Sequence, residues 1–193
     1  MTEDDVLAQF RASEALLEGH FKLSSGRHSA YYLQCARVLM NAERAGNIAR
    51  AVVANIPRDV RSRIDMVVSP AMGGVVIGHE VGRCLDKDAV FLERPTGTFE
   101  LRRGFDIAKG TRVLLVEDVV TTGLSSNEAM EAVRAAGGEV VALASIVDRS
   151  GGEATFDVPF YPLLALNFPS YADDEVPAAL ASLPVTKPGS RKK

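Results

Sequence analysis

The stretch "RVLLVEDVVTTG", residues 112–123, decides the fold of this chain. Its four consecutive apolar residues, Val113 to Val116, are typical of a strand buried on both faces, as in a parallel sheet under helices. Glu117 and Asp118 mark the carboxyl end of that strand. Because ligands of open α/β sheets sit beyond the carboxyl ends of the strands, these two acids predict a ligand site.

The rest of the chain alternates short apolar runs with segments of helical periodicity. Helical segments are predicted at residues 6–19, 41–56, 70–85 (opening with a turn) and 125–138, and further strands at 65–69, 89–93 and 139–149. A turn rich in Ser and Gly is predicted at 24–29, and the Pro- and charge-rich tail from about residue 184 is expected to be frayed. This order predicts an α/β fold with a central, mostly parallel sheet flanked by helices.

Length and composition restrict the class of protein. With 193 residues, 47% of them apolar, the chain can bury the core of one α/β domain, and we expect a single domain over residues 1–193. The net charge of -3 gives no basic field that would attract nucleic acid. No apolar run could span a bilayer and the acidic amino terminus lacks a signal-peptide pattern, so we expect a cytoplasmic protein without membrane contact. Cys35 and Cys84 are interpreted as small buried apolar residues.

The residues behind the two acids suit a phosphate group. A helix starting near Leu124 or Ser125 leaves the amide hydrogens of Thr121 to Ser126 without partners, and Gly123 permits close backbone approach. The acids would repel phosphate but suit sugar hydroxyls or a divalent cation, so together these features describe a phosphorylated sugar. A strand end with solvated acids and an ordinary helix cap is the alternative.

The motif "VLLVEDVVTTG" closely resembles the phosphoribosyl diphosphate (PRPP) motif of the type I phosphoribosyltransferases. Four other segments resemble the orotate phosphoribosyltransferases of that family: "GHFKLSSGRHSAYYLQ", "VVSPAMGGVVIG", "FLERPTGTFELRRGF" and "SIVDRSGG". The resemblance extends over about residues 15–152, in the family's order and spacing.

The resemblance implies the type I phosphoribosyltransferase fold, with a small hood formed largely by residues 1–40. It implies a pentosyltransferase that joins orotate to the phosphoribosyl group of PRPP in pyrimidine biosynthesis. It further implies Mg²⁺ held mainly through PRPP, with no direct protein ligand, and a homodimer with shared active sites in which the lid of one subunit closes over the other.

The resemblance also assigns candidate residues to each part of the site. PRPP contacts are expected from Ala71, Met72, Gly73, Gly74, Arg94, Glu117, Asp118, Val119, Val120, Thr121, Thr122, Gly123, Leu124 and Ser125. Orotate contacts are expected from Ser25, Gly26, Tyr32, Thr121 and Arg149, with Tyr31 as the alternative stacking ring. Catalytic roles are expected for Arg94, Asp118, Arg102 and Arg103, the last two on charge alone.

Two positions depart from the family pattern. Many members carry lysine where Gly73 stands, and the family usually has lysine where Ser24 stands, which leaves Arg27 or Lys22 as candidate partners of the orotate carboxylate. The lid, Arg94 to Gly104, contains neither Lys nor His. Its arginines have only Glu93, Glu100 and Asp106 as acids nearby in sequence, so we expect the lid to need an anion for stability.

Each segment also has a structural alternative. These are a tight strand-to-helix turn at 71–74, a solvated hairpin for the lid, a surface ion pair of Arg149 with Asp148 or Glu153, and structural roles for His20, His28 and His79. Two rival functions stay open: a phosphoribosyltransferase for a purine or uracil, and a PRPP-sensing regulator that binds nucleic acid. The sequence pI of about 5.7 disfavours the second.

Overall fold

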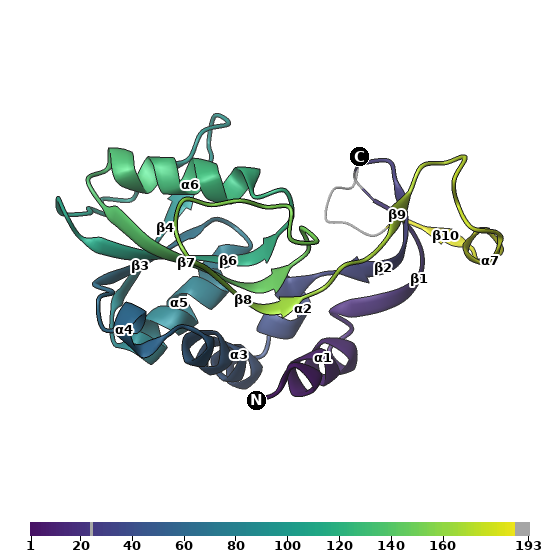
Figure 1. Ribbon diagram of the computed structural model, residues 1–193, viewed down its shortest axis with the longest axis horizontal. Coiled ribbons are helices and arrows are strands. Elements are labelled where there is room, and N and C mark those ends of the chain that lie inside the picture. The colour runs from purple at the N-terminus through teal and green to yellow at the C-terminus, as the bar shows by residue number, and fades with distance from the viewer. Residues whose placement is uncertain (24, 188–193) are drawn as a thin grey trace.

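The computed structural model describes residues 1–23 and 25–187. Its larger sheet has six strands in the order β5-β4-β3-β6-β7-β8, and every neighbouring pair is parallel except β4 and β5 (Figure 1). The strands are β3 (Met66–Pro70), β4 (Asp88–Glu93), β5 (Glu100–Leu101), β6 (Arg112–Val120), β7 (Glu139–Asp148) and β8 (Phe160–Ala165). The predicted α/β class and mostly parallel sheet are thus confirmed.

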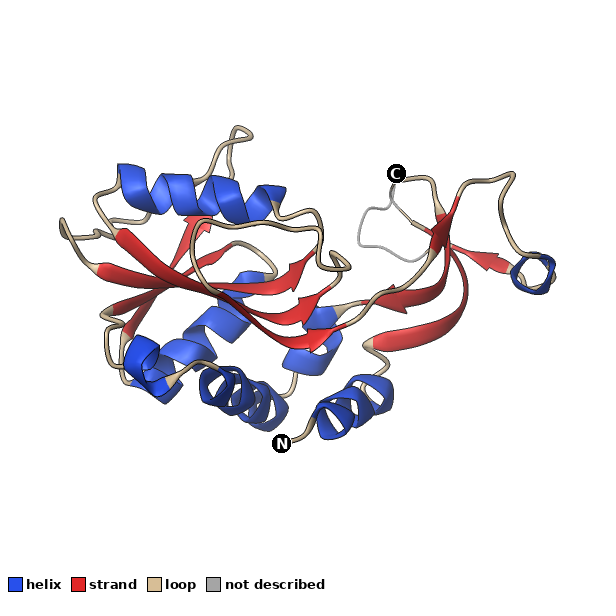
Figure 2. Ribbon diagram, viewed as in Figure 1, coloured by secondary structure: helices blue, strands red, loops and turns tan. Residues whose placement is uncertain are grey.

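Helices cover both faces of this sheet (Figure 2). One face carries α6 (Leu124–Ala135), and the other carries α3 (Ala42–Asn55) and α5 (Gly74–Leu85). Strand β6 alternates between the two cores, because Leu114 and Val116 pack on the α3 side while Val113 and Leu115 pack on the α6 side. The apolar run of β6 is therefore buried on both faces, as predicted.

Glycines at every fourth position bring α5 close to the sheet. A Cβ added at Gly78 would lie 2.5 Å from Ser69 Oγ, and one at Gly82 would lie 2.7 Å from the Cβ of Ala89. At the start of the helix, a Cβ on Gly74 would lie 3.0 Å from the carbonyl oxygen of Val116. This close contact holds the amino end of α5 beside the carboxyl ends of β3 and β6.

A second sheet of four strands, the hood, has the order β10-β1-β2-β9. It combines β1 (Leu16–Lys22) and β2 (His28–Leu33) with β9 (Ser170–Tyr171) and β10 (Val185–Thr186). The hood therefore uses both ends of the chain, whereas the sequence assigned it largely to residues 1–40. The expected frayed tail is wrong at Val185 and Thr186, since these β-prone residues pair with the edge of β1; residues 188–193 lie outside the described chain.

The first helix is shorter than predicted. Helix α1 spans Glu3–Ala12 and begins at a capping box of Thr2 and Asp5, whereas the sequence placed a helix over 6–19. The helix ends because Glu14 adopts a left-handed conformation, with φ of 53°. Leu17, which fits the helical period, instead lies partly buried in β1.

Helix α3 agrees with the predicted bounds, and four short helices complete the described fold. Helix α3 begins after Asn41, whose side chain accepts a hydrogen bond from the backbone N–H of Arg44, and it ends before Pro57 as predicted. The four short helices are α1, α2 (Cys35–Leu39), α4 (Arg58–Arg61) and α7 (Ala178–Ala181). No helix in residues 1–23 and 25–187 has the length and apolar character needed to cross a membrane.

Two buried histidines join strands of the hood. His20 Nε2 lies 2.6 Å from His28 Nδ1, and His28 Nε2 lies 2.6 Å from a carboxylate oxygen of Asp173. The other ring nitrogen of His20 lies 3.3 Å from the carbonyl oxygen of Leu183. The chain of contacts connects the β1–β2 hairpin with the carboxyl-terminal segment, so these two histidines have the structural role considered from the sequence.

Candidate active site

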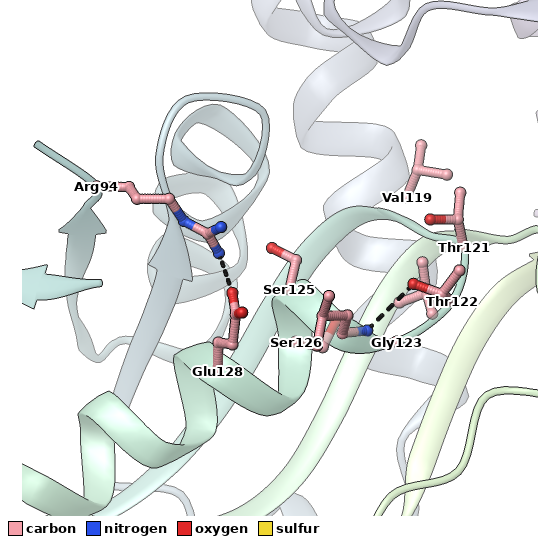
Figure 3. Close-up of a pocket in the computed structure, with 10 residues that line it drawn as sticks. Arg94, Val119, Thr121, Thr122, Gly123, Ser125, Ser126 and Glu128 are labelled. Carbon is pink, nitrogen blue, oxygen red and sulfur yellow. Dashed lines mark hydrogen bonds and ion pairs between the residues drawn. The ribbon is translucent and has the colours of Figure 1, made fainter. Parts of the chain in front are cut away.

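The loop after β6 forms a small polar cavity (Figure 3). The strand ends at Val120, the chain turns through Thr121 to Gly123, and α6 begins at Leu124. The cavity has a volume of about 220 Å³, and its lining comprises Arg94, Glu128 and every residue from Val119 to Ser126. Backbone amides at the start of a helix of this length favour an anion, so the cavity offers suitable donors to a phosphate group, whose binding there stays a prediction.

Gly123 is held in place by the segment that follows β7. Its φ is 79°, and a Cβ there would lie 3.1 Å from the Phe156 ring and 3.2 Å from the Cβ of Ala154. Both the backbone conformation and the close contact therefore require glycine at this turn.

Gly123→Ala is expected to raise the KM for PRPP by about 10-fold, because a left-handed non-glycine residue costs about 1–3 kcal/mol and the new methyl group must displace Phe156. Steady-state kinetics at varied PRPP measures the change. Gly110→Ala is the matched control, since Gly110 has a similar φ of 81° with nothing within 4 Å of an added Cβ. Equal KM values in the two variants would contradict the role of the close contact.

The two acids near the end of β6 lie beside this loop, Glu117 buried and Asp118 partly buried. Only 6% of Glu117 is exposed, and Ser126 Oγ donates a 3.4 Å hydrogen bond to its Oε1. Burial, helped by the nearby Asp118 charge, raises the pKa of Glu117 to about 8. Burial also raises the pKa of Asp118, against the opposing effect of backbone hydrogen bonds. The alternative of solvated acids is therefore wrong.

The turn at 71–74 lies directly against Asp118. A Cβ on Gly73 would be 2.5 Å from Asp118 Oδ2, so a side chain at this position would collide with the carboxylate. The backbone N–H of Ala71 donates to the carbonyl oxygen of Leu92 at 2.8 Å, and Met72 is 85% exposed. Gly73, which stands where many family members carry lysine, therefore allows the turn to lie in contact with the carboxylate of Asp118.

The lid is a β-hairpin whose arginines have acidic partners. Leu92 pairs with Leu101 across β4 and β5. Arg103 donates to both carboxylate oxygens of Glu93, at 2.7 and 3.1 Å, and Arg102 lies 3.9 Å from the same carboxylate. The expectation that the lid needs an external anion is therefore wrong for these two residues.

Arg94 lines the phosphate cavity of its own chain. Its guanidinium donates to Glu128 on α6 and lies 4.1 Å from the centre of the Phe99 ring (Figure 3). Glu128 was missed in the sequence because it stands far from the lid along the chain. The ion pair with Glu128 holds the guanidinium of Arg94 at the cavity.

Arg149 emerges at the same sheet edge with an incompletely paired side chain. Its backbone N–H donates to Val120 at 2.8 Å, but its half-buried side chain has an Nε atom with no hydrogen-bond partner among the described residues. Asp148 accepts from the backbone of Ser150 instead, and the described chain contains no ion pair between Arg149 and a carboxylate. The surface ion pair considered from the sequence is therefore wrong.

Cys35 lies near both Asp118 and Arg149, whose charges act on its thiol. Its Sγ lies 4.0 Å from the backbone carbonyl oxygen of Asp118, and burial, reinforced by the Asp118 charge, raises the pKa of the thiol although Arg149 opposes the shift. Cys35 is buried as predicted, while Cys84 is only partly buried.

The hood residues predicted to bind the base lie partly elsewhere. Ser25 and Gly26 are exposed in the turn between β1 and β2, and Ser24 lies outside the described residues. Tyr32 donates to Gln34 at 3.3 Å, whereas Tyr31 stacks on Phe168, which in turn contacts Arg149. Because neighbouring residues of a strand face opposite ways, Tyr31 rather than Tyr32 lies on the Arg149 side.

Residues 39–168 match the family model of the phosphoribosyl transferase domain. This match, the parallel sheet and the acid pair ahead of a phosphate loop define the class of type I phosphoribosyltransferases. The chain is 69% identical to the orotate phosphoribosyltransferase of Sphingopyxis alaskensis, covering 99% of this chain and 98% of the relative, and 67% identical over the full length of both to that of Erythrobacter litoralis. The chain belongs to the orotate phosphoribosyltransferase family.

Solved structures give the same result at the level of the fold. The crystal structure of orotate phosphoribosyltransferase from Aeropyrum pernix has a TM-score of 0.72 and 27% identity, covering 83% of this chain and 93% of that chain. An adenine phosphoribosyltransferase matches with a TM-score of 0.65 at 17% identity, covering 81% of this chain and 99% of that chain. The fold alone thus does not distinguish the bases.

Proposed function

We propose that the protein transfers the 5-phosphoribosyl group of PRPP to orotate, giving orotidine 5'-monophosphate and pyrophosphate. The observation that carries this proposal is the acid pair at the carboxyl edge of the sheet, with a helix-start loop directly behind it and, at the same edge, Arg149, which has no ion-pair partner among the described residues. A bond forms between the orotate ring nitrogen and the anomeric carbon, while the bond from that carbon to the pyrophosphate oxygen breaks. Orotate can react as its anion, so the reaction needs no strong base.

The loop and the acids bind the phosphoribosyl part of PRPP. The backbone amides from Thr121 to Ser126 hold the 5-phosphate, and Asp118 and Glu117 accept hydrogen bonds from the ribose hydroxyls. Asp118, and Glu117 once it has lost its proton, place negative charge near the positive charge that develops on the ring during transfer.

Backbone amides and arginine side chains bind the leaving pyrophosphate. Residues 71–74 offer amides at the end of β3, and Arg94 contributes a guanidinium at the cavity. Arg102 and Arg103 neutralise further charge after they separate from Glu93. Since arginine stays protonated near neutral pH, these residues stabilise charge and donate no proton to the reaction.

The protein groups fit a magnesium ion carried by PRPP. The described residues contain no cluster of three or more acid, histidine or cysteine ligands, and the site offers two carboxylates. Mg²⁺ commonly binds through one or two carboxylates together with substrate phosphates. When bound, the ion supplies charge neutralisation for the pyrophosphate. Glu117 and Asp118 orient the ribose hydroxyls that would bind it.

Turnover is expected to require Mg²⁺ and to favour orotate over uracil, adenine and guanine by at least about 100-fold in kcat/KM, because a site with a cation for the base rejects analogues that leave it unpaired. Incubation with PRPP, Mg²⁺ and each base, followed by chromatography of the nucleotides, measures this preference. If a purine base is turned over as fast as orotate, the orotate specificity is contradicted, whereas the proposed PRPP site is not. Turnover that persists in EDTA would remove the role of the metal.

We also propose a cytoplasmic homodimer with shared active sites. Because Arg94 lines the cavity of its own chain, the contribution across the interface falls to Arg102 and Arg103. Exposed arginines at the base of a hairpin suit this role, since their pairing with Glu93 is accessible to solvent.

Mixing Arg102→Ala, Arg103→Ala protein with Asp118→Asn, Arg149→Ala protein is expected to restore activity, because about a quarter of all sites then combine an intact pocket with an intact lid. Activity is assayed after subunit exchange, which mass spectrometry of isotope-labelled chains verifies. If exchange is complete and the mixture is no more active than its two components, the lid acts within its own chain.

A further inference from the structure

We propose that Phe168 positions the guanidinium of Arg149 for the pyrimidine base, a role that rests on the orotate-binding function proposed above. Phe168 belongs to the crossing segment, residues 166–169, which leads from β8 in the larger sheet to β9 in the hood (Figure 1). The ring therefore comes from neither the phosphate loop nor the amino-terminal hairpin.

Within residues 1–23 and 25–187, the side chain of Arg149 has no hydrogen bond that would fix the plane of its guanidinium. The backbone bond to Val120 fixes only the start of the side chain, and Nε is buried without a partner among the described residues. Burial lowers the pKa of Arg149, which reflects the removal of water from a charge that no described carboxylate neutralises. The direction of the guanidinium thus depends on packing.

The Phe168 ring provides that packing. Its centre lies 5.6 Å from the guanidinium carbon of Arg149, within the range of a cation–π contact. The same ring stacks on Tyr31 of β2, with centroids 4.6 Å apart and planes inclined by 20°. Phe168 cannot turn away from Arg149 without disturbing its contact with the hood.

Both ends of the crossing segment are fixed by hydrogen bonds. On the side of the larger sheet, the backbone N–H of Leu166 donates to the carbonyl oxygen of Asp148, the residue before Arg149, at 2.8 Å. On the hood side, the fully buried Ser29 donates through Oγ to the carbonyl oxygen of Pro169 at 3.1 Å. These bonds hold Phe168 between the two sheets. The position of the hood therefore determines where the Phe168 ring lies, and the ring in turn orients the guanidinium of Arg149.

The test compares variants that keep or remove the aromatic face. Phe168→Leu is expected to raise the KM for orotate about 3- to 10-fold, because the cation–π contact that orients the guanidinium is lost, and to leave the KM for PRPP within about twofold. Phe168→Tyr retains the ring and is expected to keep the orotate KM of the unaltered protein. Tyr161→Leu, which removes an aromatic ring of β8 packed on the same core, is the matched control.

Repeating Phe168→Leu in an Arg149→Ala background separates positioning from simple support of the fold. If Phe168 acts through Arg149, the substitution adds no further increase in the orotate KM there. An equal increase in both backgrounds, or an equal rise in both KM values, would overturn the inference while leaving the proposed function. An unchanged orotate KM in Arg149→Ala would instead overturn the base-binding role of Arg149. Should Phe168→Leu not fold, Phe168→Met carries the same comparison.

Discussion

Asp118→Asn is expected to raise the Kd for PRPP by about 10- to 100-fold, because a hydrogen bond to a charged group contributes about 1.5–3 kcal/mol. The substitution keeps the shape of the side chain that lies against Gly73 but removes the charge and turns one acceptor into a donor. Titration calorimetry with PRPP and Mg²⁺ measures the change in Kd.

The control for Asp118→Asn is the same substitution at the opposite end of the strands. Asp65 pairs with Arg112, where β6 begins, and its pair is solvent-exposed. Asp65→Asn is expected to leave the Kd for PRPP unchanged and to have a small effect on stability. If the unaltered protein and Asp118→Asn bind PRPP with equal affinity, Asp118 does not bind the sugar.

Glu117→Gln is expected to stabilise the free protein at pH 8 by on the order of 4 kcal/mol, since one pKa unit corresponds to about 1.4 kcal/mol. Burial holds the pKa of Glu117 at about 8, against an ordinary value of 4.5. Between these values the folded protein keeps a proton that the unfolded chain releases, so the free energy of unfolding falls as the pH rises. Glutamine is neutral throughout, so the advantage of the variant grows over this window and then levels off.

Denaturant unfolding of both proteins from pH 5 to pH 8.5 tests the prediction for Glu117. Glu139→Gln, at an exposed acid where β7 begins, is the control and is expected to show no such trend. A stability difference between Glu117→Gln and the unaltered protein that does not change with pH would show that burial does not hold the proton. The same variant is expected to bind PRPP more weakly, so stability and substrate affinity are opposed at this residue.

The larger sheet and the phosphate loop could be predicted because their signals are local. The apolar run before Glu117 indicates a strand buried on both faces, and the acids, threonines and glycine that form the pocket are consecutive in sequence. The hood was harder to predict, because β9 and β10 have two residues each and show no periodicity. Leu17 fits a helical period, yet it lies in a strand and pairs with Tyr32 of β2.

Site residues defined by tertiary contacts were not predictable. Glu128 and Phe168 act on Arg94 and Arg149 from distant segments, and nothing in their local sequence marks them. Tyr31 and Tyr32 are neighbours of similar chemistry, so the face that each occupies depended on the register of β2. Sequence motifs therefore indicated where the proposed site lies, while the contacts of its arginines required the structure.

The composition of the hood has a consequence for the order of folding during synthesis. Strands β3 to β8 belong to one continuous stretch, whereas β1 pairs with β10 near the opposite end of the chain. Contacts between such distant residues form late, because a long loop must close before they contribute. As the chain leaves the ribosome, the larger sheet with the proposed phosphate loop can form before the amino-terminal hairpin has its last partner strand. The proposed sugar site would therefore form before the proposed base site, and the hood would be complete only after β10 has been synthesised.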